Sequence, residues 1–310
     1  MVSQKLQQYL NHINLVVSPT LRSLIIGRLV FNKDSFSRGF SIGAGMRGEM
    51  VVEVMRIGDK IYVPISSIKG VLRRVSEVIA KNMADMVANP IEASITLAHC
   101  ELENEGLRHL CYDINGVISD LQSLSNDDLE LLALRGFIPR DKVVEISGLL
   151  REDVVLGLKH LEPFISQLCV VCRLFGGLGI AGKLRITNII LDGVRVGGLT
   201  HIMIDRGKRV VSEGALYIEE FVDLEKVIIE FIVKNVDPQM SEYTLLIKTI
   251  KALKHIDLVI GHSRGRGLGW LSLNDRDTQI IYVDLNQVTT TQQLIETIIR
   301  PETYGKKIEL

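Results

Sequence analysis

Two segments with helical periodicity alternate with β-rich segments along this chain, and this order limits the folds that it can adopt. The first periodic segment opens at Ser66 or Ser67, which are good N-caps, and stops at Asn89-Pro90. The second opens at Ser241. Each amphipathic helix needs an apolar surface to cover, and the β-rich segments supply that surface.

The segments around these helices have the composition of strands. They are rich in β-branched and large apolar residues, and turns such as Gly58-Asp59 and Asp192-Gly193 separate them. The order strand, helix, strands, helix, strand predicts an α+β fold with a ferredoxin-like sheet and both helices on one face. The expected strands are 21–31, 50–57, 60–64, 184–191, 194–196, 216–221, 227–236 and 270–273.

Composition excludes several classes of protein. Hydrophobic residues make up 46% of the 310 residues, so disorder of the whole chain is excluded. No apolar run approaches the length of a membrane span, and the first residues lack the pattern of a signal peptide. We therefore expect a cytoplasmic protein without a membrane partner.

The net charge of −1 argues at first against nucleic-acid binding, but it hides an uneven distribution. Residues 22–75 carry ten basic and four acidic side chains, residues 173–209 carry seven and two, and residues 248–266 carry five and one. Residues 85–162 carry six basic and fifteen acidic side chains. The acidic block falls on an expected helical insertion at 91–172, whereas each basic block contains a motif that suits RNA.

The four cysteines lie in two patches and predict a structural zinc site. Two residues separate Cys169 from Cys172, which is the spacing of a zinc knuckle, and the other patch adds two histidines. The alternative is four small apolar residues in a core. The expected ligands are Cys100, Cys111, Cys169 and Cys172, with His99 and His109 as alternates.

The first RNA-suited motif is the Gly-rich loop at 261–269. No Gly-Lys-Ser/Thr ends it, and it precedes a strand, so it is neither a P-loop nor a dinucleotide fingerprint. Four glycines allow close approach to a phosphodiester chain, and Arg264 and Arg266 supply charge. The alternative is a flexible turn.

The other two motifs are a helix start and a hairpin. Ser66, Ser67, Lys69 and Arg73 combine free amide groups with cations one turn apart, as in an anion site, although a solvated helix face has the same pattern. Residues 201–209 alternate apolar and polar side chains and run into a basic tip that contains glycine. This pattern predicts a projecting β-hairpin, with an ordinary surface hairpin as the alternative.

Together these motifs resemble the RAMP superfamily of CRISPR proteins, over about residues 20–275. The run from Pro64 to Arg73 comes first, and the run from Cys169 to Gly176 follows it. Then come Ile204-Asp-Arg206 with Glu213-Gly-Ala-Leu216, the pair Glu219-Glu220, and finally the loop from Ser263 to Gly269. Their order is similar to that in backbone subunits of type III (Csm/Cmr) interference complexes. The resemblance implies an antiviral role in which the subunit binds the CRISPR RNA guide and target RNA beside other Cas subunits.

The resemblance also implies a domain plan and a set of RNA contacts. Residues 20–90 and 173–275 would form a modified ferredoxin-like (RRM-like) palm, 197–215 a hairpin thumb, 91–172 an insertion that binds zinc in several relatives, and 276–310 a C-terminal extension. The implied RNA-binding residues are Ser66, Ser67, Lys69, Arg73, His201, Met203, Arg206, Arg209, Ser263, Arg264 and Arg266.

Catalysis by this subunit is not implied by the residues present. Many such subunits cut target RNA with an Asp and a divalent metal, and alignment places Val51 at that position. The carboxylates of Glu49, Glu53 and Asp34 remain as candidates for Mg²⁺ binding or base catalysis. We therefore expect a scaffold that does not cut RNA. The alternatives are a metal-dependent endoribonuclease and a zinc-stabilised interaction protein without an RNA role.

Overall fold

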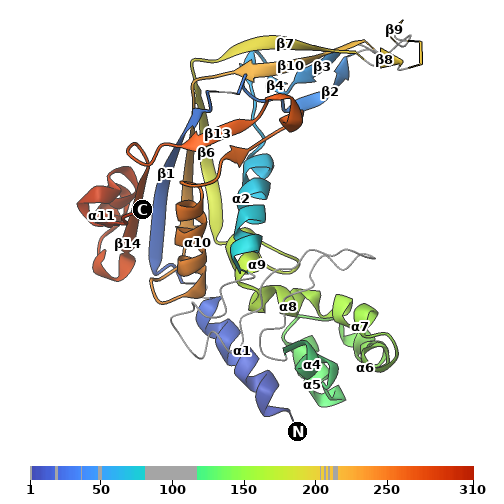
Figure 1. Ribbon diagram of the computed structural model, residues 1–310. Coiled ribbons are helices and arrows are strands. Elements are labelled where there is room, and N and C mark those ends of the chain that lie inside the picture. Colours follow the sequence, from blue (N-terminus) through green and yellow to red (C-terminus); the bar gives the residue numbers. More distant parts are fainter. Residues whose placement is uncertain are drawn as a thin grey trace.

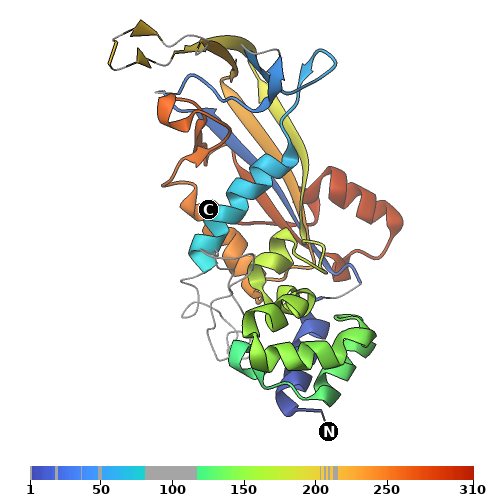
Figure 2. The same cartoon turned by 90° about the vertical axis from the view of Figure 1, so that its right-hand side faces the viewer.

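The computed structural model combines helices with sheets that are antiparallel except for the parallel pair Val51–Val54 and Tyr217–Asp223, and thereby confirms the α+β class (Figure 1). It describes residues 2–17, 20–35, 37–47, 51–80, 117–202, 204–205, 207–208, 210–211 and 216–310. A long sheet forms the centre, a hairpin projects at one end, and a helical lobe that includes the N-terminus lies at the other (Figures 1 and 2). Within these ranges, no helix has the length and apolar character to cross a membrane.

The central sheet has the strand order β12-β13-β1-β11-β6, and all neighbouring strands are antiparallel. Strand β1 pairs with β13 only through residues 31–33, and its residues 23–28 pair with a further strand, β14. Residues after 276 therefore extend the sheet. The strands are β1 (Ser23–Lys33), β6 (Leu184–Asp192), β11 (Lys226–Lys234), β12 (Leu258–Val259), β13 (Trp270–Leu273), β14 (Gln279–Asp284) and β15 (Lys306–Lys307).

Two helices, α2 (Ile65–Ala80) and α10 (Ser241–Ala252), cover one face of this sheet (Figure 1). Their apolar stripes are buried because they face the alternate, inward side chains of the strands. The expected start of the first helix at Ser66 or Ser67 is wrong, since the helix begins at Ile65 and both serines lie in its first turn. Its expected end at Asn89-Pro90 lies outside the described residues.

A second sheet with the order β2-β3-β10-β7 carries the projecting hairpin. Strands β7 and β10 are antiparallel over their whole length, and the short pair β8 and β9 continues the hairpin to its tip. This sheet contains β2 (Gly43–Arg47), β3 (Val51–Val54), β7 (Arg195–His201) and β10 (Tyr217–Asp223). The tip strands are β8 (Ile204–Asp205) and β9 (Val210–Val211), and a separate small hairpin has β4 (Arg56–Ile57) and β5 (Lys60–Ile61).

The helical lobe contains the N-terminal helix α1 (Gln4–Val16), which the sequence analysis does not predict. Two hydrogen bonds attach α1 to the other helices of the lobe. The Ser3 backbone N–H donates to Asp128 Oδ1 over 2.8 Å, and the Tyr9 hydroxyl donates to Asp120 Oδ2 over 2.7 Å. The other helices are α4 (Val117–Gln122), α5 (Asn126–Leu134), α6 (Val143–Glu152), α7 (Val154–His160), α8 (Glu162–Leu168) and α9 (Val170–Phe175).

The remaining elements are single turns and one C-terminal helix. Short 3₁₀ turns lie at Arg140–Lys142, Arg264–Arg266, Leu285–Gln287 and Pro301–Thr303. Helix α11 (Thr291–Ile299) lies on the face of the central sheet opposite α2 and α10 (Figures 1 and 2).

A buried ion cluster joins the lobe to the central sheet. Arg173 of α9 has no exposed surface, and its guanidinium donates to both carboxylate oxygens of Glu242 in α10 over 2.8 and 3.2 Å. Lys183 donates to the same carboxylate over 2.6 Å. Burial raises the pKa of Glu242, but these two cations outweigh it and hold that pKa far below its usual range.

His12 of α1 lies beside this cluster and gives the fold a sensitivity to acid. Burial and the charge of Arg173 lower the pKa of His12 to about 3, and its Nε2 accepts or donates no hydrogen bond within the described residues. The unfolded chain therefore binds a proton at His12 before the folded chain does, so stability is present above about pH 6.5 and is lost as the pH falls.

We expect the free energy of unfolding to fall by about 1 kcal/mol between pH 6.5 and pH 5.5, a range that lies above the pKa of about 4.5 that Glu242 has in the unfolded chain. Urea unfolding at several pH values measures this loss. The matched variant His12→Phe keeps the volume, removes the titrating ring and should lose less than half as much over the same range. Equal losses in the two proteins would contradict the assignment to His12.

Candidate nucleic-acid interface

The Gly-rich loop is held in place by backbone contacts on two sides. Gly269 N–H donates to the Gly39 carbonyl over 2.6 Å, and His262 N–H donates to the Ser41 carbonyl over 2.8 Å. Gly261 and Gly269 have φ angles of +78° and +89°, and a Cβ on Gly261 would lie 2.1 Å from the Ser41 oxygen. Only glycine fits these contacts, which hold both ends of the loop against residues 39–41.

The two arginines of this loop lie on an exposed 3₁₀ turn, Arg264–Arg266. The Nε of Arg264 donates to the Gly261 carbonyl over 3.0 Å, and the indole of Trp270 donates to the Arg264 carbonyl over 3.1 Å. Arg266 reaches the hairpin, where its Nη1 donates to His201 Nδ1 over 2.7 Å and to the Tyr217 hydroxyl over 3.3 Å. The loop therefore presents two cations next to the base of the hairpin.

The base of the hairpin is a buried polar pair. His201 of β7 and Glu219 of β10 have side-chain exposures of 8% and 4%, and His201 Nε2 lies 2.8 Å from Glu219 Oε2. Ser263 of the loop donates to the same oxygen over 2.5 Å. Burial raises the pKa of Glu219, but the hydrogen bonds from Ser263 and His201 outweigh it and leave the pKa below its usual value.

The start of α2 gathers cations, as the motif predicts. Ser66 is exposed, and Ser67 and Lys69 are half-buried. Burial and the charges of Arg73 and Arg185 lower the pKa of Lys69. Mutual repulsion of this kind favours the binding of an anion, because an anion would relieve it.

Arg73 has internal contacts that the motif does not reveal. Its Nε donates to Glu77 over 2.9 Å, and its Nη1 donates to the carbonyl of Gly176 over 2.7 Å. Gly176 follows α9 and has a φ of +99°, so Arg73 holds a turn at the junction of the lobe and α2. A role in RNA binding would come in addition to this structural one.

The hairpin tip is only partly described. Met203, Arg206 and Arg209, which are implied RNA contacts, lie outside the described residues. The described part exposes β-branched side chains, since Ile204 is 57% and Val210 is 54% accessible. Apolar side chains on a projecting hairpin suit contact with base edges or with another protein chain.

The carboxylates that were candidates for catalysis do not form a described cluster. Asp34 directly follows β1, and Glu53 is a half-buried residue of β3, while Glu49 lies outside the described residues. Val51 opens β3 and pairs with Ile218. In the part of the chain that the structure describes, no three His, Cys, Asp or Glu side chains are grouped to hold a metal ion.

Two of the expected zinc ligands are described and both are buried. Cys169 caps α9 and Cys172 lies in its first turn, and neither has exposed surface. Arg73 Nη2 lies 3.7 Å from Cys172 Sγ. Two sulfurs three residues apart supply half of a tetrahedral ligand set, so the pair fits zinc in number and type. His99, Cys100, His109 and Cys111 lie outside the described residues.

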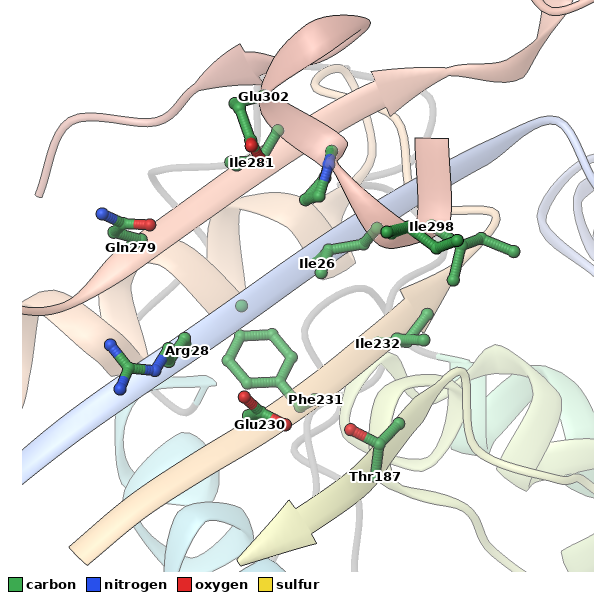
Figure 3. A pocket seen from close by; sticks show the side chains of 13 residues that line it. Ile26, Arg28, Thr187, Glu230, Phe231, Ile232, Gln279, Ile281, Ile298 and Glu302 are labelled. Atoms are coloured by element: carbon green, nitrogen blue, oxygen red, sulfur yellow. The ribbon is translucent and has the colours of Figure 1, made fainter. Parts of the chain in front are cut away.

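A hollow on the face of the central sheet opposite α2 and α10 is a weaker candidate for an RNA-binding site. It has a volume of about 490 Å³ and lies between α11 and strands β1, β11 and β14 (Figure 3). Its lining combines isoleucines such as Ile26 and Ile298 with one cation, Arg28, and two carboxylates, Glu230 and Glu302. This charge balance does not favour a phosphodiester chain, so the loop and hairpin base form the better site.

Comparison with known families agrees with this geometry. The model of the RAMP superfamily matches residues 42–272, which include the Gly-rich loop, the hairpin and α2. The chain belongs to the RAMP superfamily, and this membership indicates a CRISPR-associated, RNA-binding role. No curated protein matches the chain.

Sequence reasoning missed Tyr217, and it placed Glu219 in a motif of the resemblance without giving it a role in the site. Both lie on β10, and the register pairs Tyr217 with His201 across the hairpin. The spacing of Tyr217 and Glu219 in the sequence could have indicated the site. Residues i and i+2 of a strand share a face, so these two side chains lie on the same face of β10.

Proposed function

We propose that this protein is a backbone subunit of a type III CRISPR complex that binds the CRISPR RNA guide and holds the guide–target RNA duplex beside other Cas subunits. The observation that carries the proposal is the fixed Gly-rich loop, which presents Arg264 and Arg266 directly beside the base of a projecting hairpin. A rigid basic loop suits the phosphate backbone, and a hairpin suits the duplex itself.

The topology of the central sheet supports a ferredoxin-like palm as part of this proposal. The four strands β13, β1, β11 and β6 lie in that order, and α2 and α10 connect them on one face. Numbered along the chain these strands are fourth, first, third and second, which is the order that two interleaved β-α-β units produce. The Gly-rich loop before β13 and the hairpin of β7 and β10 lie at the same end of this sheet (Figure 1).

We propose a scaffold and not a nuclease, since Val51 stands where a catalytic Asp is expected and a valine cannot bind Mg²⁺. The test is the complex assembled with guide RNA and complementary target RNA in Mg²⁺. The scaffold predicts no target cleavage that depends on this subunit. Periodic cuts that disappear in Glu49→Ala, Glu53→Ala or Asp34→Ala would instead establish the endoribonuclease.

Structural zinc is a separate proposal. Purified protein should contain about one equivalent of zinc, because one ion takes four ligands, and Cys172→Ser should lower the content and destabilise the fold. Metal analysis of the two proteins measures this directly. Less than half an equivalent in the unsubstituted protein would contradict a zinc site and leave the cysteines as core residues.

A further inference from the structure

The Gly-rich loop and the base of the hairpin are joined by a row of three ionisable side chains. Glu219 Oε2 lies 2.8 Å from His201 Nε2, and His201 Nδ1 lies 2.7 Å from Arg266 Nη1. The first two side chains are buried and the third is exposed. The row therefore runs from the interior of the second sheet to the surface where RNA would bind.

The chemistry of arginine fixes the state of His201. A guanidinium can only donate hydrogen bonds, so His201 Nδ1 must accept one and carries no proton. Nε2 then carries the single proton and donates it to the carboxylate of Glu219. His201 is therefore neutral, and Glu219 selects the tautomer that can hold Arg266.

Two further contacts keep the imidazole and the carboxylate in place. The His201 ring stacks on Tyr217, with ring centroids 4.6 Å apart and an angle of 27° between the planes. Ser263 donates to the same Glu219 oxygen over 2.5 Å, and its backbone lies in the left-handed region with a φ of +52°. The loop and the hairpin thus share one carboxylate oxygen, which fixes their relative position.

One edge of the Arg266 guanidinium remains available for a ligand. Nη1 makes both contacts to the hairpin, while Nε and Nη2 make no hydrogen bond to any residue that the structure describes. The Nε and Nη2 groups of an arginine form a fork that matches two oxygens of a phosphate. An arginine already held in one rotamer loses less entropy when it binds.

We propose that Glu219 and His201 are positioning residues, which orient Arg266 so that its free edge binds an RNA phosphate. His201 then acts through Arg266 and does not contact RNA itself, in contrast to the direct contact that the family resemblance implies. The inference rests on the proposed RNA-binding function and adds to it the two residues that orient Arg266 toward an RNA phosphate.

A double-mutant cycle on RNA affinity tests the proposal. The dissociation constant of a fluorescein-labelled single-stranded RNA is measured at several salt concentrations for the unsubstituted protein, Arg266→Ala, His201→Phe and the double variant. His201→Phe keeps the ring against Tyr217 but loses both nitrogens. We expect Arg266→Ala and His201→Phe each to weaken binding about fivefold and to lower the salt slope by about 0.7, with no further loss in the double variant.

A conservative variant and a spectroscopic measurement separate positioning from a general structural role. His201→Gln can accept from Arg266 and donate to Glu219, so it should keep most of the affinity. Imidazole ¹⁵N spectra of the unsubstituted protein at neutral pH should show the proton on Nε2 alone. This measurement holds even where His201→Phe fails to fold.

The outcomes distinguish this inference from the proposed function. Loss of affinity in Arg266→Ala without any loss in folded His201→Phe would overturn the inference alone, as would additive losses or an imidazole protonated at Nδ1. No loss in Arg266→Ala would instead contradict the role of the loop in RNA binding.

Discussion

Replacement of Arg173 by alanine is expected to lower the free energy of unfolding by about 3–5 kcal/mol. The reason is that Arg173 and Glu242 are both fully buried, with side-chain exposures of 0% and 0%. Removal of the arginine leaves the Glu242 carboxylate buried with Lys183 as its remaining cation. The Gln167 and Leu168 carbonyls, which also accept from Arg173, lose a donor as well.

Equilibrium unfolding in urea measures this effect, and a partly exposed ion pair provides the control. Lys33 and Asp223 are 2.6 Å apart with side-chain exposures of 28% and 39%, so Lys33→Ala should cost less than about 1 kcal/mol. Similar costs for Arg173→Ala and Lys33→Ala would show that the buried cluster does not join the lobe to the central sheet as described.

The second large effect concerns RNA. The triple variant Lys69→Ala, Arg264→Ala, Arg266→Ala should bind single-stranded RNA roughly 100-fold more weakly, since each lost phosphate contact is worth about 1 kcal/mol. Because such contacts do not read sequence, the loss should be similar for unrelated RNA sequences. Fluorescence anisotropy at a fixed, moderate salt concentration measures it.

A charge-matched variant separates this local effect from the change in net charge. Arg135, Arg140 and Arg151 are exposed cations of the helical lobe, and their replacement by alanine removes the same total charge far along the chain from the loop. This control should change the affinity by less than about threefold. An equal loss in both triple variants would place the RNA-binding charge elsewhere.

Local patterns predict most of the central elements because their causes are local. The segment from Ser241 forms α10 as expected, and the strand expected at 270–273 is β13. Helix α1 was not predicted because it packs against α8, which is more than a hundred residues away in the sequence. Nothing in the N-terminal sequence indicates that partner. Strand β14 was not predicted for the same reason, because its partner β1 is distant in the sequence.

Charge counting overestimates one of the basic blocks. Residues 173–209 include Arg173 and Lys183, which are both paired with Glu242 in the interior. Those two cations therefore add little to the field at the surface. The block at 248–266 contains Arg264 and Arg266, which are exposed on their turn. Burial decides which charges reach a ligand, and the sequence does not show burial directly.

The candidate site was predictable as separate residues but not as a connected group. Composition and motif order point to Ser263, Arg266 and His201 individually. Their connection through Glu219 depends on the register of β7 and β10 and on the left-handed backbone at Ser263, and both are properties of the folded chain. The same limit explains Arg73, whose hydrogen bond to the Gly176 carbonyl brings together residues far apart in sequence.

The most direct test of the account is to locate RNA on the folded protein by photocrosslinking. A photoreactive amino acid replaces Arg264 in the loop or, as the control, Ile295, which is 52% exposed. Ile295 belongs to α11, the helix on the face of the central sheet opposite α2 and α10. We expect the probe at 264 to crosslink to bound guide RNA and the probe at 295 to give no crosslink. Crosslinks at 295 with none at 264 would contradict the proposed interface.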